Sequence, residues 1–273
     1  MNIKRKFFSI NENSNYKIVT IFWIIRIKVK RRFKILYEEI RTLILKEMAN
    51  IETRIMASNI HPDTFKNYAN IFTNKFVYLI APGPSLEMFD PNDHNGIYVG
   101  VNRAFLYNKV KLDFLFIQDY LEKEQKLADD YIGNNCIKFY GIIPNIRLRN
   151  LQSIKRIPMS SRFNSNALTY ILAGKLKDIF AYDLSNEPIG DFLGTVFSAM
   201  QFILYTHPKK IFLVGCDCSQ GYFNGSDSKN NAEYQIEIWK KIAKFANEIY
   251  PDVKIISINP VGLKGVFEDI YIK

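Results

Sequence analysis

The sequence predicts an α/β protein built on a mainly parallel sheet, preceded by a basic helical extension. Short, almost continuous apolar runs recur between residues 76 and 260, and longer, more polar segments separate them. Strands that are apolar on both faces and that each lead into a helix are typical of a parallel sheet covered on both sides. An uneven distribution of charge sets the N-terminal quarter apart from the rest of the chain.

Six apolar runs are expected to be strands, and two periodic segments are expected to be helices. The strands are FVYLI (76–80), IYVGV (97–101), DFLFIQD (113–119), CIKFY (136–140), KIFLVGCD (210–217) and KIISINP (254–260). The helices cover residues 195–207 and 231–250, and in the second Ile236, Trp239 and Ile242 form an apolar stripe that faces the core. The pattern predicts an extension over residues 1–70 and one domain over residues 71–273.

Composition excludes global disorder, since 48% of the 273 residues are hydrophobic and 23% are charged. Lys and Arg outnumber Asp and Glu by 37 to 27, and residues 1–75 hold 15 Lys/Arg against 6 Asp/Glu. Nine of the ten net positive charges therefore lie in the first quarter of the chain. Such an excess points to phosphates, anionic substrates or an anionic lipid surface as partners.

Residues 16–48 combine aliphatic and aromatic residues with a dense basic cluster at residues 26–34. From Phe33 onward the apolar residues approximate helical spacing, which predicts a helix with an apolar face beside a cationic one. This segment either lies on an anionic membrane or docks on a partner, or it packs on the domain with its charges solvated. No run approaches the roughly 20 apolar residues of a membrane span, and no secretory signal is recognisable. We therefore expect a cytoplasmic protein, peripheral at the inner face of the membrane.

The cysteines and histidines do not predict a metal site or a catalytic triad. Cys136, Cys216 and Cys218 are odd in number and two are too close for an ordinary bridge, which favours a reducing compartment. The Cys216-x-Cys218 spacing does not suit zinc. His61 precedes Pro62 at an expected helix start, and no arrangement of nucleophile and histidine stands out. No metal and no cofactor are expected.

Polar residues follow several of the expected strands, where ligands bind in an open parallel sheet. The residues at these strand ends are Gly83, Pro84, Ser85, Asn102, Gln118, Asp119, Asp217, Asn259 and Pro260. The segment 81–85 is neither a Walker loop nor a GxGxxG turn. Gly83 would let the backbone approach an anion, and Ser85 would cap a following helix beside the ligand, although a purely structural turn is an equal alternative.

The side chains at the other strand ends also allow two interpretations. The amides of Asn102 and Gln118 suit a sugar hydroxyl or a pyrimidine edge, or else they cap neighbouring backbone. Asp217 binds ribose hydroxyls or holds a loop. Residues 218–234, rich in Gly, Ser and Asn, are either a lid that brings Tyr222 and Asp227 to a substrate or a plain surface loop.

Several segments, taken in order, resemble the bacterial sialyltransferases of glycosyltransferase family 42. They are LIAPGPSL, VNRAF, FIQD, GTVFSAMQFILYTHPKKIFLVGCD and KIISINPVGL. They are similar also to the related motility accessory factors and hydroxymethylpterin diphosphokinase-like proteins, and the match covers roughly residues 76–265. The resemblance implies a single Rossmann-like domain with a lid, which binds a nucleotide-activated sugar, typically a CMP-linked nonulosonate, without a metal.

The resemblance also implies roles for individual residues. The positions that match the family's nucleotide-site motifs are Gly83, Pro84, Ser85, Asn102, Thr195, Asp217 and Pro260, with Gly194 directly before Thr195. Gln118 falls where the family has an asparagine, and Pro82 falls where it has another. Tyr222 stands at one of the lid tyrosine positions and is expected to hydrogen-bond the leaving phosphate.

The family's catalytic histidine, in a His-Ser-Lys-Asn context, meets Asp227-Ser228-Lys229-Asn230 in this chain. A transferase needs a base that takes the proton of the acceptor hydroxyl, and a carboxylate can do this as an imidazole does. Asp227 is therefore the expected base, with Glu233 as a second candidate.

Three functional hypotheses follow. The first is a metal-independent glycosyltransferase of polysaccharide or glycoconjugate synthesis, which uses a CMP-nonulosonate-like donor and a glycan or lipid-linked acceptor. The second is a diphosphokinase that uses ATP and magnesium, for which Asp119 and Asp217 are the best pair of ligands. The third is a non-catalytic binding protein whose basic segment holds a membrane or a partner. No nucleic-acid-binding motif is recognisable.

Overall fold

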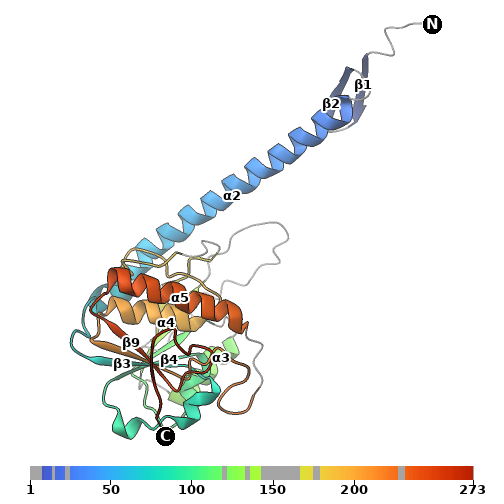
Figure 1. Ribbon diagram of the computed structural model, residues 1–273. Coiled ribbons are helices and arrows are strands. Elements are labelled where there is room, and N and C mark those ends of the chain that lie inside the picture. The colour runs from blue at the N-terminus through green and yellow to red at the C-terminus, as the bar shows by residue number, and fades with distance from the viewer. Residues whose placement is uncertain are drawn as a thin grey trace. The chain divides into compact units, whose positions relative to one another are not determined.

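The computed structural model describes residues 8–13, 16–21, 25–118, 122–132, 136–142, 167–174, 179–226 and 231–272 (Figure 1). Side chains are described from Ile35 onward within these ranges, except at positions 93 and 122–125. The chain divides into two units, one of residues 1–49 with 146–149, the other of residues 50–145 with 150–273.

The first unit contains a two-stranded antiparallel ladder and the greater part of a long helix. Strands β1 (Phe8–Asn13) and β2 (Tyr16–Ile21) pair with Phe8 opposite Ile21, and helix α2 runs over Ile25–Phe65. The helix confirms the predicted helical extension. The ladder was not predicted, although the β-branched run at residues 18–21 has the composition of a strand. Within the described ranges no helix is long and apolar enough to cross a bilayer.

The second unit is built on one parallel sheet of eight strands, in the order β10-β9-β8-β3-β4-β5-β6-β7. The strands are β3 (Phe76–Ile80), β4 (Ile97–Val101), β5 (Phe114–Ile117), β6 (Ile137–Ile142), β7 (Ala167–Ile171), β8 (Lys210–Val214), β9 (Lys254–Ile258) and β10 (Glu268–Ile270). All six predicted strands are present, and the fold class is confirmed. β7 and β10, at the two edges of the sheet, were not predicted.

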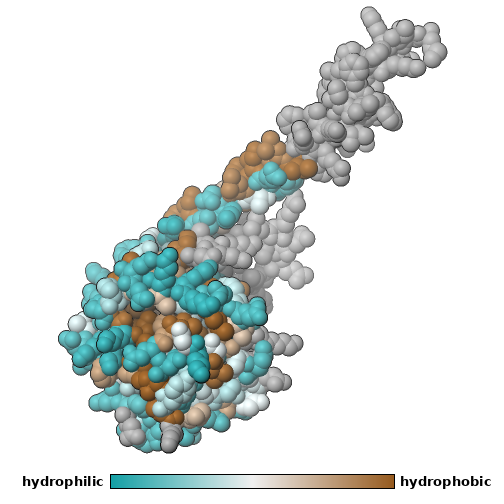
Figure 2. Space-filling model, in the orientation of Figure 1, coloured by the Kyte–Doolittle hydropathy of each residue, from teal (hydrophilic) through white to brown (hydrophobic). Residues whose placement is uncertain are grey.

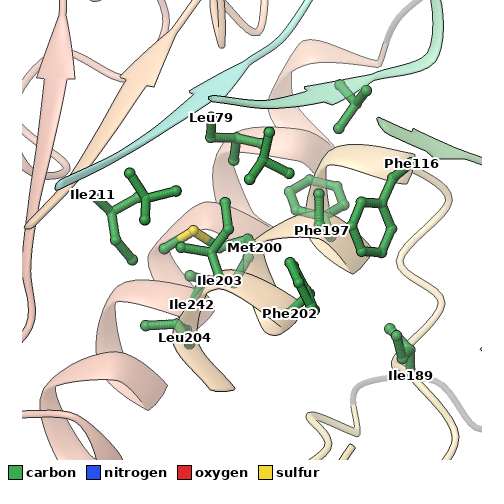
Figure 3. Packing of buried hydrophobic residues seen from close by; sticks show 14 of the residues in the cluster. Leu79, Phe116, Ile189, Phe197, Met200, Phe202, Ile203, Leu204, Ile211 and Ile242 are labelled. Carbon is green, nitrogen blue, oxygen red and sulfur yellow. The ribbon is translucent and has the colours of Figure 1, made fainter. Parts of the chain in front are cut away.

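Helices α4 (Thr195–Tyr205) and α5 (Ala232–Ile249) lie side by side over one face of the sheet (Figure 1). Both confirm the predicted segments. α4 is buried along almost its whole length because the sheet covers one of its sides and α5 another. Figure 3 shows Phe197, Met200 and Ile203 of α4 among the side chains of the sheet and α5. This packing fixes the start of α4 relative to the ends of the strands.

The opposite face of the sheet is covered by shorter elements. They are helix α3 (Glu122–Ile132) and the 3-10 helices η2 (Pro84–Met88), η3 (Pro91–Asp93) and η4 (Asn102–Leu106); a further one, η1 (Lys66–Tyr68), follows α2. The segment after β3 was expected to open a helix capped by Ser85. Instead Gly83, which has no side chain to act as a cap, precedes the five-residue η2, and Ser85 lies within η2.

The C-terminal end of α2 packs within the second unit and covers the edge strand β7. The ring of His61 accepts a hydrogen bond from the Ile171 N–H at 2.8 Å through Nε2, and its Nδ1–H donates to the Leu184 carbonyl at 2.9 Å. The Thr64 hydroxyl donates to the Thr169 carbonyl at 2.7 Å. The prediction that His61 marks a helix start was wrong, because α2 continues through Pro62 to Phe65.

Candidate nucleotide site

A pocket of about 160 Å³ lies at the carboxyl ends of the central strands. β3 is the first strand of the sheet in the sequence. β4 pairs with one side of it and β8, much later in the chain, pairs with the other, so the direction of strand order reverses between β3 and β8. In open α/β sheets ligands bind outside the strand ends at such a switch point. The turns after β3, β4 and β8 line this pocket, together with the start of α4 and one side of α5.

Two glycines let the turns after β3 and β8 lie backbone against backbone. The Gly83 N–H donates to the Gly215 carbonyl at 2.9 Å, and the Ala81 N–H donates to the Val214 carbonyl at the same distance. A Cβ at Gly83 would stand 2.3 Å from the Gly215 oxygen, and one at Gly215, whose φ is +67°, would stand 2.1 Å from the Ala81 oxygen. Neither position therefore accepts a side chain.

Asp217 holds the first turn rather than facing a ligand. Its two carboxylate oxygens accept hydrogen bonds from the Ser85 N–H, at 2.6 Å, and from the Ser85 hydroxyl. Only 3% of Asp217 is exposed, and burial raises the pKa of its carboxyl while the two hydrogen bonds act in the opposite direction. Because both oxygens are engaged, Asp217 does not present a free ligand for magnesium, which weakens the diphosphokinase hypothesis.

The N-terminus of α4 opens into the pocket. Gly194 precedes the helix and no side chain caps it, so the N–H groups of its first turn are not satisfied by a capping side chain. The Thr195 hydroxyl donates to Asn102 Oδ1 at 2.9 Å, which joins the helix start to the end of β4. Asn102 is in the left-handed region, with φ at +45°, a conformation that asparagine tolerates better than most residues. Backbone donors, a hydroxyl and an amide thus gather at one point of the pocket.

Phe223, in the first part of the predicted lid, is hydrogen-bonded to the turn after β3. The Phe223 N–H donates to the Pro82 carbonyl at 2.9 Å, and the Phe223 ring packs edge-on against Tyr107 with centroids 5.5 Å apart. A turn in which the Tyr222 N–H donates to the Ser226 carbonyl follows directly. These bonds place Tyr222 in the pocket wall.

Trp239 and two cysteines form the side of the pocket next to α5. The Cys218 thiol accepts a hydrogen bond from the Trp239 side chain, yet burial raises the pKa of this thiol to about 12. Burial also raises the pKa of the Cys216 thiol well above its usual range. Both thiols are therefore protonated near neutral pH and are not poised as nucleophiles.

The structure brings only part of the predicted site together. Gly83, Asn102, Gly194, Thr195, Asp217 and Tyr222 line the pocket, whereas Pro84, Ser85, Gln118, Asn259 and Pro260 are not among its lining residues. Gln118 Nε2 donates to Asp191 at 3.1 Å, and Asn259 Oδ1 accepts from the Ile272 N–H at 2.9 Å. Asp119 and Asp227 lie outside the described residues.

Several residues that line the pocket were not predicted from the sequence to be site residues. Leu193 lies at the pocket with 76% of its surface exposed and with φ at +58°, an uncommon conformation for a leucine. Gln235 and Trp239 enter from α5, where helical periodicity indicated a core-facing stripe for Trp239. Among the residues whose positions are described, no group of three His, Cys, Asp or Glu side chains is arranged to hold a metal ion.

The fold and pocket define an open parallel α/β protein with a crevice at its switch point. No protein-family model and no curated protein matches the sequence. Among solved structures, the MAf glycosyltransferase from Magnetospirillum magneticum AMB-1 is similar, with a TM-score of 0.47 and 9% identity. That match covers 80% of this chain but only 38% of the other, so this chain spans well under half the length of that protein.

The sialyltransferase CstII from Campylobacter jejuni, solved with the substrate analogue CMP-3FNeuAc, is also similar. Its TM-score is 0.40 and its identity 13%, over 71% of this chain and 85% of that one. Both names fall within the group whose motifs this sequence resembles. At such values neither likeness bears on the activity of this chain, which has to be inferred from its own residues.

Proposed function

We propose that the protein is a glycosyltransferase that transfers a sugar from a nucleotide-activated donor to a glycan or lipid-linked acceptor. The observation that carries this proposal is the junction of Asn102, Thr195 and the uncapped start of α4 inside the switch-point pocket. A helix N-terminus offers aligned N–H donors and a partial positive charge to a phosphate. In this proposal the phosphate of the sugar nucleotide binds at this junction.

The favoured donor carries a single phosphate, as a CMP-linked nonulosonate does. The described residues that line the pocket offer neutral hydrogen-bond donors, with Asp217 as the one charged side chain among them. Neutral donors and a helix dipole suit one phosphate better than a diphosphate, whose larger charge is usually balanced by a cation. The donor is therefore expected to be bound without a metal cofactor.

The remaining groups are assigned by what they can do chemically. The Asn102 amide can donate as well as accept, which suits a pyrimidine edge or a sugar hydroxyl. Tyr222, in the pocket wall, is the donor to the leaving phosphate. Asp227, one residue after the fastened turn at Ser226, is the base that takes the proton of the acceptor hydroxyl, with Glu233 as the second candidate.

The protein is further proposed to work in the cytoplasm next to the inner face of the membrane. The basic run at residues 26–34 would hold it there, because each Lys or Arg near an anionic surface adds on the order of 1 kcal/mol. This placement would bring the pocket to a lipid-linked acceptor.

The pocket assignment is tested by titrating CMP, UDP and GDP into the full chain and into an Asn102→Asp variant. The carboxylate still accepts from Thr195 but repels a phosphate, so CMP affinity is expected to fall at least about tenfold. Asn74→Asp is the matched control, because Asn74 is also in the left-handed region, at φ +65°, but is exposed and lies outside the pocket lining. Absence of binding by all three nucleotides, or equal loss in both variants, contradicts the proposal.

The reaction itself is tested by a transfer assay with the donor that binds best. Asp227→Asn is expected to lower kcat by about 100-fold or more while leaving donor affinity unchanged, because a general base acts on the acceptor. Full activity of this variant removes Asp227 as the base but leaves the pocket assignment intact.

A further inference from the structure

The part of α2 that follows the basic run carries an exposed apolar stripe. Its side chains are each between 49% and 64% exposed, and Figure 2 shows apolar residues along this part of the helix. We call this stripe the seam; it consists of Tyr37, Ile40, Ile44, Met48, Ile51 and Ile55. Scattered exposed apolar residues need no explanation, but six on one line of one helix mark an interaction surface.

The spacing of the seam is that of a coiled coil. The intervals between successive seam residues are three, four, four, three and four, so that Tyr37 and Met48, Ile40 and Ile51, and Ile44 and Ile55 are each eleven residues apart. Eleven residues make almost a whole number of helical turns, so the seam stays on one side of the helix as it advances. A sustained 11-residue repeat is the pattern of helices that wind around one another with a slight right-handed supercoil. The occupant that this pattern fits is another helix with the same repeat.

The charges beside the seam favour a protein partner over lipid. Residues 35–55 hold three basic and four acidic residues, a net charge of −1, which gives no attraction to anionic headgroups. Arg41 and Glu52, eleven apart, share one flank of the seam, and Glu47 and Arg54, seven apart, share the other. Because each flank presents both signs, a second helix of the same sequence offers opposite charges to both.

We propose that the seam binds the seam of a second copy of this chain, so that α2 is an oligomerisation helix. The same surface then serves on both copies, as in most symmetric homo-oligomers. Association covers the six half-exposed side chains of α2. It also gathers the basic runs of the copies on one assembly, which multiplies their attraction to an anionic surface.

The proposal is tested by sedimentation equilibrium of the full chain across the micromolar range, for wild type and for Ile44→Glu. Wild type is expected to show a mass of at least twice 31.9 kDa. Ile44→Glu puts a charge in the middle of the seam. It is expected to raise the protein concentration at which half of the chains are associated by more than about 100-fold. Thr42→Glu, at an exposed position of α2 outside the seam, adds the same charge and is expected to change nothing.

Ile44 is 53% exposed in the single chain, so the substitution spares the core, and an unchanged circular dichroism spectrum and melting temperature verify this. Ile51→Glu repeats the test independently, and Ile44→Leu, which keeps the side chain apolar, is expected to associate as wild type does. A monomeric wild type, or an oligomer that both glutamate variants leave intact, overturns the proposal. So does a monomeric wild type that sediments with phosphatidylglycerol vesicles and is released by Ile44→Glu, since lipid is then the occupant.

Discussion

The buried His61 makes the stability of the domain depend on pH in a direction that the structure determines. Its ring is fully buried and neutral, with Nδ1–H donating to Leu184 and Nε2 accepting from Ile171. Burial lowers the pKa of His61 from 6.5 to about 4, although the hydrogen bond to Leu184 opposes the change. The unfolded chain therefore binds a proton between these two values and the folded chain does not.

Because of this difference in proton binding, the domain becomes less stable as the pH falls. The stabilisation is complete above pH 6.5 and is lost as the pH falls towards 4, at about 1.4 kcal/mol per pH unit. Over the whole window this amounts to roughly 3 kcal/mol, a large part of the stability of an ordinary domain. Acid conditions are thus expected to loosen the end of α2 from the edge strand β7.

Urea unfolding of wild type and His61→Gln at several pH values measures this effect. Glutamine is not titratable, so the advantage of wild type over the variant is expected to shrink by up to roughly 3 kcal/mol on acidification from neutral pH towards 4. Comparing the two proteins cancels the titration of other groups. An advantage that stays constant from neutral pH to 5, or an NMR titration that places the His61 pKa near 6.5, would refute the reasoning.

Three further tests, two of them with a second substitution for comparison, concern the floor of the pocket and the buried charge beside the sheet. Gly83→Ala is expected to destabilise the domain by about 2–3 kcal/mol or more and to abolish nucleotide binding in a thermal-shift assay, because its Cβ clashes with backbone. Gly225→Ala, with nothing within 4 Å of the added Cβ, is expected to cost only about 1 kcal/mol for its φ of +75°. Asp217→Asn replaces one of two acceptors with a donor and is expected to cost about 1–3 kcal/mol in urea unfolding. Lys138→Met breaks the buried ion pair with Asp129 and is expected to be destabilising, whereas adding Asp129→Leu is expected to recover much of the loss.

The central part of the sheet could be predicted from the sequence because its strands are continuous apolar runs. β7, with the sequence ALTYI, was missed although it is as long as most predicted strands, and β10 has only three residues. The ladder of β1 and β2 was missed because its residues merge with an apolar segment that continues into α2. Local composition alone does not separate these cases.

Of the residues predicted at strand ends, those with side chains or backbone in the pocket lining follow three adjacent strands. Gly83, Asn102 and Asp217 follow β3, β4 and β8, which are neighbours, so their positions converge at one edge. Gln118 and Asn259 follow β5 and β9, each two strands away from β3. With strands about 4.8 Å apart, these side chains start roughly 10 Å from the end of β3. Sheet order depends on long-range pairing, which no single segment of sequence reveals.

The turns after β3 and β8 are joined through backbone groups, and this has a consequence for how specificity can change. The Gly83–Gly215 contact depends on the absence of side chains, so it tolerates no variation. The surrounding wall at Leu193 and Gln235 is made of side chains that take no part in that contact. Under the proposed function, substitutions at these two positions would alter which donor fits, whereas Tyr222 is assigned to the leaving phosphate. A search for variants with new donors therefore belongs at Leu193 and Gln235.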